Sequence, residues 1–318
     1  MNDKELKLIE PIQTDPASFP RSEEIPEGCI VIDGWQDEFK YKVDVHKVIY
    51  ATRYINANSE AKNIELSMYI YEPKTFSGTE KFPVIVYAQG SAFHKQWLFD
   101  HISQHVRMAE RGYIICAFEY RPSELAPFPA QAQDCKTAIR YMRKNAEIYH
   151  CDADHVALWG DSSGGHTVLI AGFTGNDEPD IDLYKEYSAH VNCIVDWFGP
   201  TDFSKMNYYP SSQDHISPES PEGYEIGRKN VLEHPELVAP TIPMNYLSAD
   251  KPAPPTLIMH GGRDMLVPFN QSCRLYNRMK ELGKEATLVK LNDANHGFLG
   301  FNCEKALDIV DIFLRNHI

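Results

Sequence analysis

The sequence predicts an α/β protein with a mostly parallel central sheet and helices on both of its faces. Short runs rich in β-branched and aromatic residues alternate along the chain with longer segments of helical period. Several of these runs are almost continuously apolar, which is typical of strands covered on both faces. A chain of 318 residues is within the range of one such domain. We therefore predict a single domain over residues 1–318.

The predicted strands and helices follow one another in a regular order. Two runs that resemble a hairpin come first, at residues 47–52 and 64–73. Strand and helix then alternate, which indicates parallel strands joined by crossover helices. The later strands are predicted at residues 82–90, 112–120, 155–160, 191–199, 255–261 and 286–291. The helices are predicted at residues 128–149, 163–173, 270–283 and 303–318.

Two parts of the chain depart from this alternation. Residues 204–251 are rich in proline, serine and acidic residues and show little periodicity. A segment of that length inside a domain is usually a lid or a binding loop, so we predict a cap or lid insertion there. Residues 1–35 mix prolines with charges of both signs and are predicted to form an N-terminal arm.

Charge and composition exclude several kinds of partner. The net charge is −14 and no run of lysine and arginine could bind phosphates, so a nucleic acid is not expected. No apolar stretch is long enough to cross a membrane. The N-terminus lacks the pattern of a secretory signal, which predicts a cytoplasmic protein. The seven cysteines have no metal-binding spacing, so we expect reduced thiols and neither a metal nor a cofactor.

A serine nucleophile is predicted at the turn between the run at residues 155–160 and the next helix. The segment "GDSSG" places Ser162 between Gly160 and Gly164 in a GxSxG pattern that follows a strand and precedes a helix. A turn this tight has no room for side chains at its flanks and holds the central serine exposed. A short pattern also occurs by chance, so the prediction depends on the partners of Ser162.

The partners of a serine nucleophile are a base and an acid, because the hydroxyl must lose its proton and the base must be held in the right tautomer. Asp264 and His296 each follow an apolar strand, in the order serine, acid, histidine. Asp202 is an alternative acid, whereas Asp293 is too near His296 in sequence. Among the other histidines, we expect a satisfied hydrogen-bonding role for His260 and a packing role for His166.

An oxyanion hole is predicted from small residues after the strand at residues 82–90. Backbone N–H groups must point at the anion that forms when the serine attacks, and one of them comes from the residue after the nucleophile, Ser163. The segment "QGSA" offers little side chain to block a substrate. We predict that Ser91 and Ala92 supply the other donors and that Gly90 makes the turn.

These motifs together resemble the α/β-hydrolase fold, in particular hormone-sensitive-lipase-like and bacterial feruloyl- or acetylxylan-esterase-like carboxylesterases. The resemblance runs from about residue 84 to the C-terminus through "PVIVYAQGSAF", "VALWGDSSGGH", "DWFGPTDF", "PPTLIMHGGRD" and "NDANHGF". The family commonly has a histidine and three glycines where this chain has Gln89, Gly90, Ser91 and Ala92. The added Cβ atoms predict a narrower acyl pocket and favour small acyl groups such as acetyl.

The resemblance implies a serine carboxylesterase that hydrolyses short acyl esters on carbohydrates, without a cofactor. Its expected partner is a small-molecule or oligosaccharide ester substrate, and a homo-oligomer is left open. Aromatic rings that could stack on a sugar or cinnamoyl ring are Phe93, Trp97 and Trp197, with Tyr208 and Tyr209 as further candidates. The alternatives are a feruloyl esterase, an amidase or peptidase of the same fold, and a binding protein without catalysis.

Overall fold

The computed structural model describes residues 41–57, 60–75, 78–180, 183–297 and 300–318, together with scattered residues between 11 and 31. The chain divides into two units, Met1–Glu38 and Phe39–Ile318. Most of the predicted arm at residues 1–35 lies outside the described residues.

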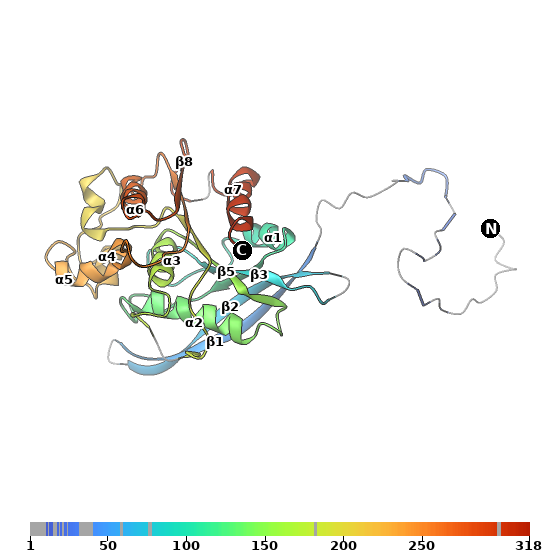
Figure 1. Cartoon of the computed structure of the whole chain (residues 1–318), viewed down its shortest axis with the longest axis horizontal. Helices are drawn as coiled ribbons and strands as arrows, with labels where there is room; N and C mark the ends of the chain where they lie inside the picture. The colour runs from blue at the N-terminus through green and yellow to red at the C-terminus, as the bar shows by residue number, and fades with distance from the viewer. Residues whose placement is uncertain are drawn as a thin grey trace. The chain divides into compact units, whose positions relative to one another are not determined.

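The strands of the described chain form one eight-stranded sheet in the order β1-β2-β4-β3-β5-β6-β7-β8. Figure 1 shows the strands and helices of this part of the chain. β1 pairs antiparallel with β2, and β2 pairs antiparallel with β4. All remaining pairs are parallel, which confirms the predicted fold class. The strands are β1 (Lys42–Ala57), β2 (Glu60–Lys74), β3 (Phe82–Ala88), β4 (Ile114–Phe118), β5 (Cys151–Asp161), β6 (Cys193–Trp197), β7 (Thr256–Gly261) and β8 (Ala286–Leu291).

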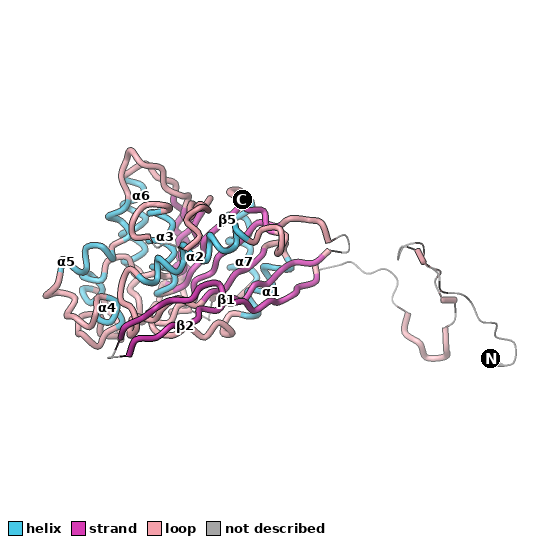
Figure 2. The backbone as a smooth tube through the Cα atoms, turned by 90° about the horizontal axis from the view of Figure 1, so that it is seen from below, coloured by secondary structure: helices cyan, strands magenta, loops and turns pink. Residues whose placement is uncertain are grey.

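The opening hairpin is longer than the sequence predicts. β1 and β2 pair over almost their whole length, and Figure 2 shows them running side by side. The sequence signal is weaker at the ends of both strands, where lysine, asparagine and acidic residues alternate with apolar ones. Pairing with the neighbouring strand extends the β structure through these polar ends.

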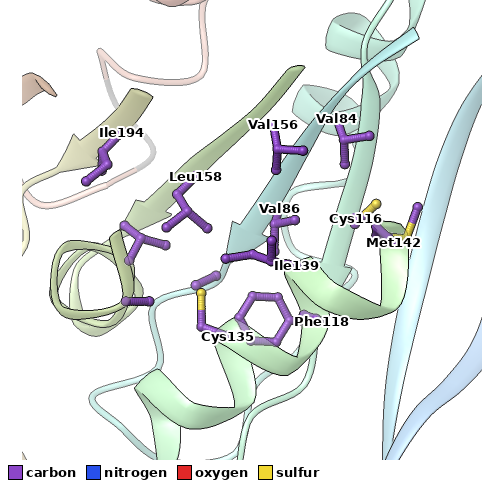
Figure 3. Packing of buried hydrophobic residues seen from close by; sticks show 14 of the residues in the cluster. Val84, Val86, Cys116, Phe118, Cys135, Ile139, Met142, Val156, Leu158 and Ile194 are labelled. Carbon is purple, nitrogen blue, oxygen red and sulfur yellow. The ribbon is translucent and has the colours of Figure 1, made fainter. Parts of the chain in front are cut away.

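Helices cover both faces of the sheet. α2 (Ala130–Lys144), α3 (Ser163–Thr174) and α6 (Asn270–Glu281) pack on one face, and α1 (Ile102–Glu110) and α7 (Glu304–Arg315) pack on the other. Figure 3 shows the first of these layers, where Cys135, Ile139 and Met142 of α2 lie against strand residues such as Val86 and Phe118. Burial of these apolar side chains is the main source of stability for such layers.

α1 was not predicted, and its buried face explains why. That face consists of Gln104, His105, Met108 and Ala109, so two of its four residues are polar. A helix is recognised in sequence by apolar residues on one side, and in α1 two polar residues take half of that side.

The segment at residues 204–251 folds into short helical turns. Its elements are η2 (Phe203–Tyr208), α4 (Pro221–Glu225), α5 (Pro235–Val238), η3 (Ala239–Thr241) and η4 (Pro243–Tyr246). A small apolar cluster joins it to the loop that follows β3, since Phe93 of that loop packs with Phe203, Ile226, Val231 and Val238. That this segment acts as a cap remains a prediction.

Candidate active site

Ser162 lies at the sharp turn between β5 and α3, as the sequence predicts. Its backbone has a φ of +52°, a left-handed value that is costly for a residue with a side chain. The turn is held because the Ser162 N–H donates to the carbonyl oxygen of Trp197 at 2.9 Å. This hydrogen bond to the neighbouring strand β6 holds Ser162 in its strained conformation. The conformation directs the hydroxyl out of the sheet.

Glycines let three segments of backbone approach one another at this turn. A Cβ atom on Gly160 would lie 2.3 Å from the carbonyl oxygen of Gly164, and one on Gly164 would lie 1.9 Å from that of Ala88. A Cβ atom on Gly90 would lie 2.7 Å from the Cβ of Ser162. These distances are too short for any side chain, so the end of β3, the end of β5 and the start of α3 require glycine where they meet.

His296 and Asp264 meet Ser162 at the carboxyl edge of the sheet. His296 Nε2 lies 2.9 Å from Ser162 Oγ, and His296 Nδ1 lies 2.8 Å from Asp264 Oδ2. The loops after β5, β7 and β8 supply the three residues, and parallel strands bring the ends of such loops to one edge. This arrangement permits the hydroxyl to pass its proton to the imidazole while the carboxylate orients the ring.

The Asp264 carboxylate is fully saturated with donors. Its Oδ1 accepts the N–H groups of Leu266 and Val267, both at 2.9 Å. Its Oδ2 lies 2.8 Å from His296 Nδ1 and 3.1 Å from His260 Nε2. Burial alone would raise the pKa of Asp264, but the hydrogen bonds from His260 and His296 outweigh it and lower the pKa to about 2. Stability from this group is therefore present above its ordinary pKa of 3.8 and is lost as pH falls through about 2.

His260 has the satisfied hydrogen bonds predicted from the sequence, and it also makes a contact that was not predicted. Its Nδ1 lies 2.7 Å from Ser272 Oγ, and its Nε2 lies 2.9 Å from the carbonyl oxygen of Val267. A carbonyl only accepts, so Nε2 carries the proton and can also face Asp264 Oδ2. His260 thereby supports the acid from beneath the site.

Asn295 and Phe198 also support the histidine, and neither was predicted from the sequence. The Asn295 Oδ1 accepts the N–H groups of Met265 at 2.9 Å and His296 at 2.7 Å, so one side chain ties the acid loop to the histidine loop. The Phe198 ring lies 4.6 Å from the His296 ring, centroid to centroid. Asn295 directly precedes His296 in the sequence, but its hydrogen bond to the acid loop is visible only in three dimensions.

The predicted oxyanion donors are corrected at one position. The Ser91 N–H donates to Ser163 Oγ at 2.9 Å, so it is not available to an oxyanion. Within the described chain, the N–H groups of Ala92 and Ser163 have no acceptor, and both residues line the cavity beside Ser162. The two free donors are thus Ala92 and Ser163, and Ser91 instead holds their loops together.

A buried tyrosine completes this link between the loops. The Tyr120 hydroxyl donates to the carbonyl oxygen of Gln89 at 2.8 Å and lies 3.0 Å from Ser91 Oγ and 3.3 Å from Ser163 Oγ.

The backbone of Ala92 has a φ of +53°. The loop therefore keeps at Ala92 the left-handed conformation that glycine adopts without strain, although it carries a methyl group there.

A cavity of about 290 Å³ opens above Ser162. The loop after β3 forms one part of its wall, including Ala92 and Phe93, and His101 at the start of α1 adjoins it. The segment at residues 204–251 supplies another part, from Gln213, His215, Pro221 and Glu222. The site is therefore a pocket with apolar residues near the serine and several polar groups on the side of the short helices.

The structure separates the three aromatic residues predicted to bind substrate. Phe93 is 1% exposed and lines the cavity. Trp197 is 2% exposed and packs in the core against Trp159 and Phe301, so its predicted contact with substrate is corrected. Trp97 is 65% exposed. The described residues that line the cavity do not include Trp97, Tyr208 or Tyr209.

The alternative acids and the remaining histidine have other partners. Asp202 Oδ2 accepts from Arg274 at 2.7 Å. Asp293 lies at the surface beside Arg263. His166 is buried, its Nε2 lies 2.7 Å from the carbonyl oxygen of Thr241, and its ring packs against Phe93.

The described residues contain neither a candidate metal site nor a candidate membrane span. No group of three or more histidine, cysteine, aspartate or glutamate residues among them is placed to hold a metal ion. None of the helices described above has the length and hydropathy that a membrane span requires.

Solved structures of esterases resemble this chain over most of its length. A carbohydrate esterase from gut microbiota, in a truncated form, is 29% identical with a TM-score of 0.74, covering 88% of this chain and 97% of that one. A bifunctional GH43-CE protein of Bacteroides eggerthii is 25% identical with a TM-score of 0.69, covering 84% of this chain and 38% of that one.

A curated esterase and a family model also match this chain by sequence. Esterase LipC of Mycobacterium tuberculosis is 26% identical over 228 residues, which cover 69% of this chain and 54% of LipC. The chain spans about half the length of the curated relatives it matches. The BD-FAE family model matches residues 68–279. The chain therefore belongs to the BD-FAE family, and its fold is the α/β-hydrolase fold of the esterases that it resembles.

Proposed function

We propose that the protein is a serine esterase that hydrolyses short acyl esters, acetyl esters above all, on carbohydrate substrates. The observation that carries this proposal is the continuous line of hydrogen bonds from Ser162 through His296 to Asp264, beside two N–H groups without an acceptor. These are the parts that two-step acyl transfer requires.

In this mechanism His296 Nε2 takes the proton of Ser162 as its oxygen attacks the ester carbonyl. Asp264 holds the Nδ1 proton of His296 and stabilises the imidazolium that forms. The N–H groups of Ala92 and Ser163 stabilise the tetrahedral oxyanion. The imidazolium then protonates the departing alcohol, and a water molecule, activated by the same ring, releases the acid from the acyl-enzyme.

The size and lining of the cavity support the proposed substrate class. The Ala92 methyl group and the buried Phe93 ring restrict the space beside Ser162, which favours a small acyl group. The polar side of the cavity, where the half-buried Gln213 presents its amide, supports hydrogen bonds to the hydroxyl groups of a sugar. The similarity to a carbohydrate esterase supports the same choice of alcohol.

The test is a burst experiment with wild-type protein. Mixing with p-nitrophenyl acetate should release close to one p-nitrophenol per protein molecule before the steady state, and a fluorophosphonate probe should label Ser162. A protein without a burst or labelling would contradict the proposal. Acetylated xylo-oligosaccharides, a feruloylated sugar and an aminoacyl anilide then compare the substrate classes, and the highest kcat/KM is expected for the acetylated sugar.

Ala92→Gly is expected to relax the preference for acetyl esters. Removing the methyl group enlarges the cavity beside the serine, and glycine adopts a φ of +53° without strain. The ratio of kcat/KM for p-nitrophenyl butyrate to that for the acetate should rise by about tenfold, since one or two methylene groups in a tight pocket have effects of that order. An unchanged ratio would show that Ala92 does not limit the acyl group.

A further inference from the structure

A second histidine–carboxylate pair lies in the wall of the same cavity. His215 Nδ1 lies 2.9 Å from Glu222 Oε2, and the two side chains are 2% and 3% exposed. Both residues line the cavity and belong to the segment at residues 204–251. The mechanism above uses neither of them. A buried ionisable pair is costly unless its geometry and hydrogen bonds are good, so its presence calls for a role.

The partners of the His215 ring determine its charge. Nε2 lies 2.9 Å from the carbonyl oxygen of Leu266 and 3.1 Å from Ser211 Oγ. The Ser211 hydroxyl donates to the same carbonyl at 2.7 Å, so its oxygen can only accept from the ring. Nδ1 faces a carboxylate, which also accepts. Both ring nitrogens therefore carry protons, and the ring is an imidazolium paired with the Glu222 carboxylate.

The carbonyl that His215 holds belongs to the loop that carries the proposed catalytic acid. The peptide group between Leu266 and Val267 presents its carbonyl to His215 and Ser211 on one side, and on the other it donates the Val267 N–H to Asp264 Oδ1 at 2.9 Å. Next to it, the Met265 carbonyl accepts from the N–H of Ser212 at 2.8 Å. Residues 211–215 thus bind carbonyl groups on the outer side of the loop, while Asp264 binds N–H groups on its inner side.

We propose that His215, as an imidazolium paired with Glu222, is a positioning residue that fixes the Leu266 peptide and through it the Asp264 carboxylate. The inference rests on the proposed function of Asp264. It makes the segment at residues 204–251 part of the catalytic framework, because loosening the Leu266 carbonyl loosens the group that orients His296. Misplacement of an orienting group by a fraction of an ångström lowers the rate of the chemical step.

The electrostatics of the pocket favour the charged ring. Burial alone would lower the pKa of His215, but Glu222, the Leu266 carbonyl and nearby Asp214 outweigh it and raise the pKa above its ordinary 6.5. The charged pair is therefore fully formed below pH 6.5 and is lost as pH rises through the raised value. A His–Asp pair that acts as general base gives kcat an acidic limb only, so His215 should add an alkaline limb.

Glu222→Gln tests the proposal through this alkaline limb. The glutamine keeps the size of the side chain but removes the charge that raises the pKa of His215. The alkaline limb of kcat for p-nitrophenyl acetate should move to lower pH by about one unit, which is a tenfold loss of the charged ring at a given alkaline pH. The acidic limb should stay in place. Glu236→Gln is the matched control, because Glu236 forms an exposed pair with His234 in the same segment.

A second measurement needs no variant. Nitrogen-15 spectra of the histidine rings in wild-type protein should show a His215 ring that keeps both nitrogens protonated above pH 6.5. A His215 ring protonated on Nε2 alone, or a wild-type profile without an alkaline limb, would overturn the proposal. Fluorophosphonate labelling separates this failure from that of the proposed function: Glu222→Gln that is labelled at Ser162 but keeps its alkaline limb overturns only the role of His215.

Discussion

Ser162→Ala is expected to lower kcat for p-nitrophenyl acetate by about 10⁵-fold or more. The alanine removes the oxygen that lies 2.9 Å from His296 Nε2, so no acyl-enzyme can form. Residual turnover should come from substrate binding and from the N–H donors of Ala92 and Ser163, which do not depend on the hydroxyl. The fluorophosphonate probe should no longer label the protein.

The fold should tolerate this substitution, since alanine differs from serine by one oxygen and keeps the backbone bond to Trp197. Thermal unfolding followed by circular dichroism checks this. Ser103→Ala on α1 is the matched control, because Ser103 is exposed and lies outside the cavity-lining residues. Near wild-type turnover in Ser162→Ala would refute its assignment as nucleophile.

Asp264→Asn should lower kcat by about 10⁴-fold with little change in KM. The N–H groups of Leu266 and Val267 require an acceptor at the Oδ1 position, so the amide oxygen must stay there. The amide NH₂ group then replaces Oδ2 and faces the ring nitrogens of His296 and His260. His296 can meet it only as the tautomer with its proton on Nε2, and that tautomer cannot accept the proton of Ser162.

Kinetics over a pH range, with Asp293→Asn as the comparison, checks this result. Asp293 is exposed and lies three residues before His296, so its amide should leave kcat unchanged. If Asp264→Asn lost no more than a few-fold, another carboxylate would have to orient the imidazole.

The sequence predicted the strands and the three residues of the proposed triad because each is encoded locally. An apolar run is visible in five or six letters, and Gly160, Gly164 and Ser162 lie within one turn whose geometry excludes other residues. Asp264 and His296 are recognisable because each follows such a run. Parallel strands then bring distant loops to one edge without further information.

The parts that were missed depend on contacts between distant segments. Ser91 has the small side chain of an oxyanion loop, but its N–H is taken by Ser163, and that hydrogen bond is visible only in three dimensions. Trp197 comes just before the loop that faces the site, yet strand alternation turns its ring into the core. Helix α1 was not predicted because the polar residues Gln104 and His105 lie on its buried face. His101, which precedes this helix and lines the cavity, was therefore not predicted as a site residue.

The segment at residues 204–251 illustrates the same limit. Its prolines and acidic residues predict an irregular insertion, and short helical turns are what the structure contains. The contact of His215 with the Leu266 carbonyl joins residues 51 positions apart, so no periodicity in the sequence could indicate it.

The glycines around the nucleophile restrict how this protein can evolve. Where β3, β5 and α3 touch, a single methyl group on Gly160 or Gly164 would collide with peptide oxygen atoms. Any residue change there would disturb folding and turnover together, so selection for heat resistance cannot act on this junction without risking the chemistry. Gains in thermal stability must come from elsewhere, for example from the long hairpin of β1 and β2 at one edge of the sheet.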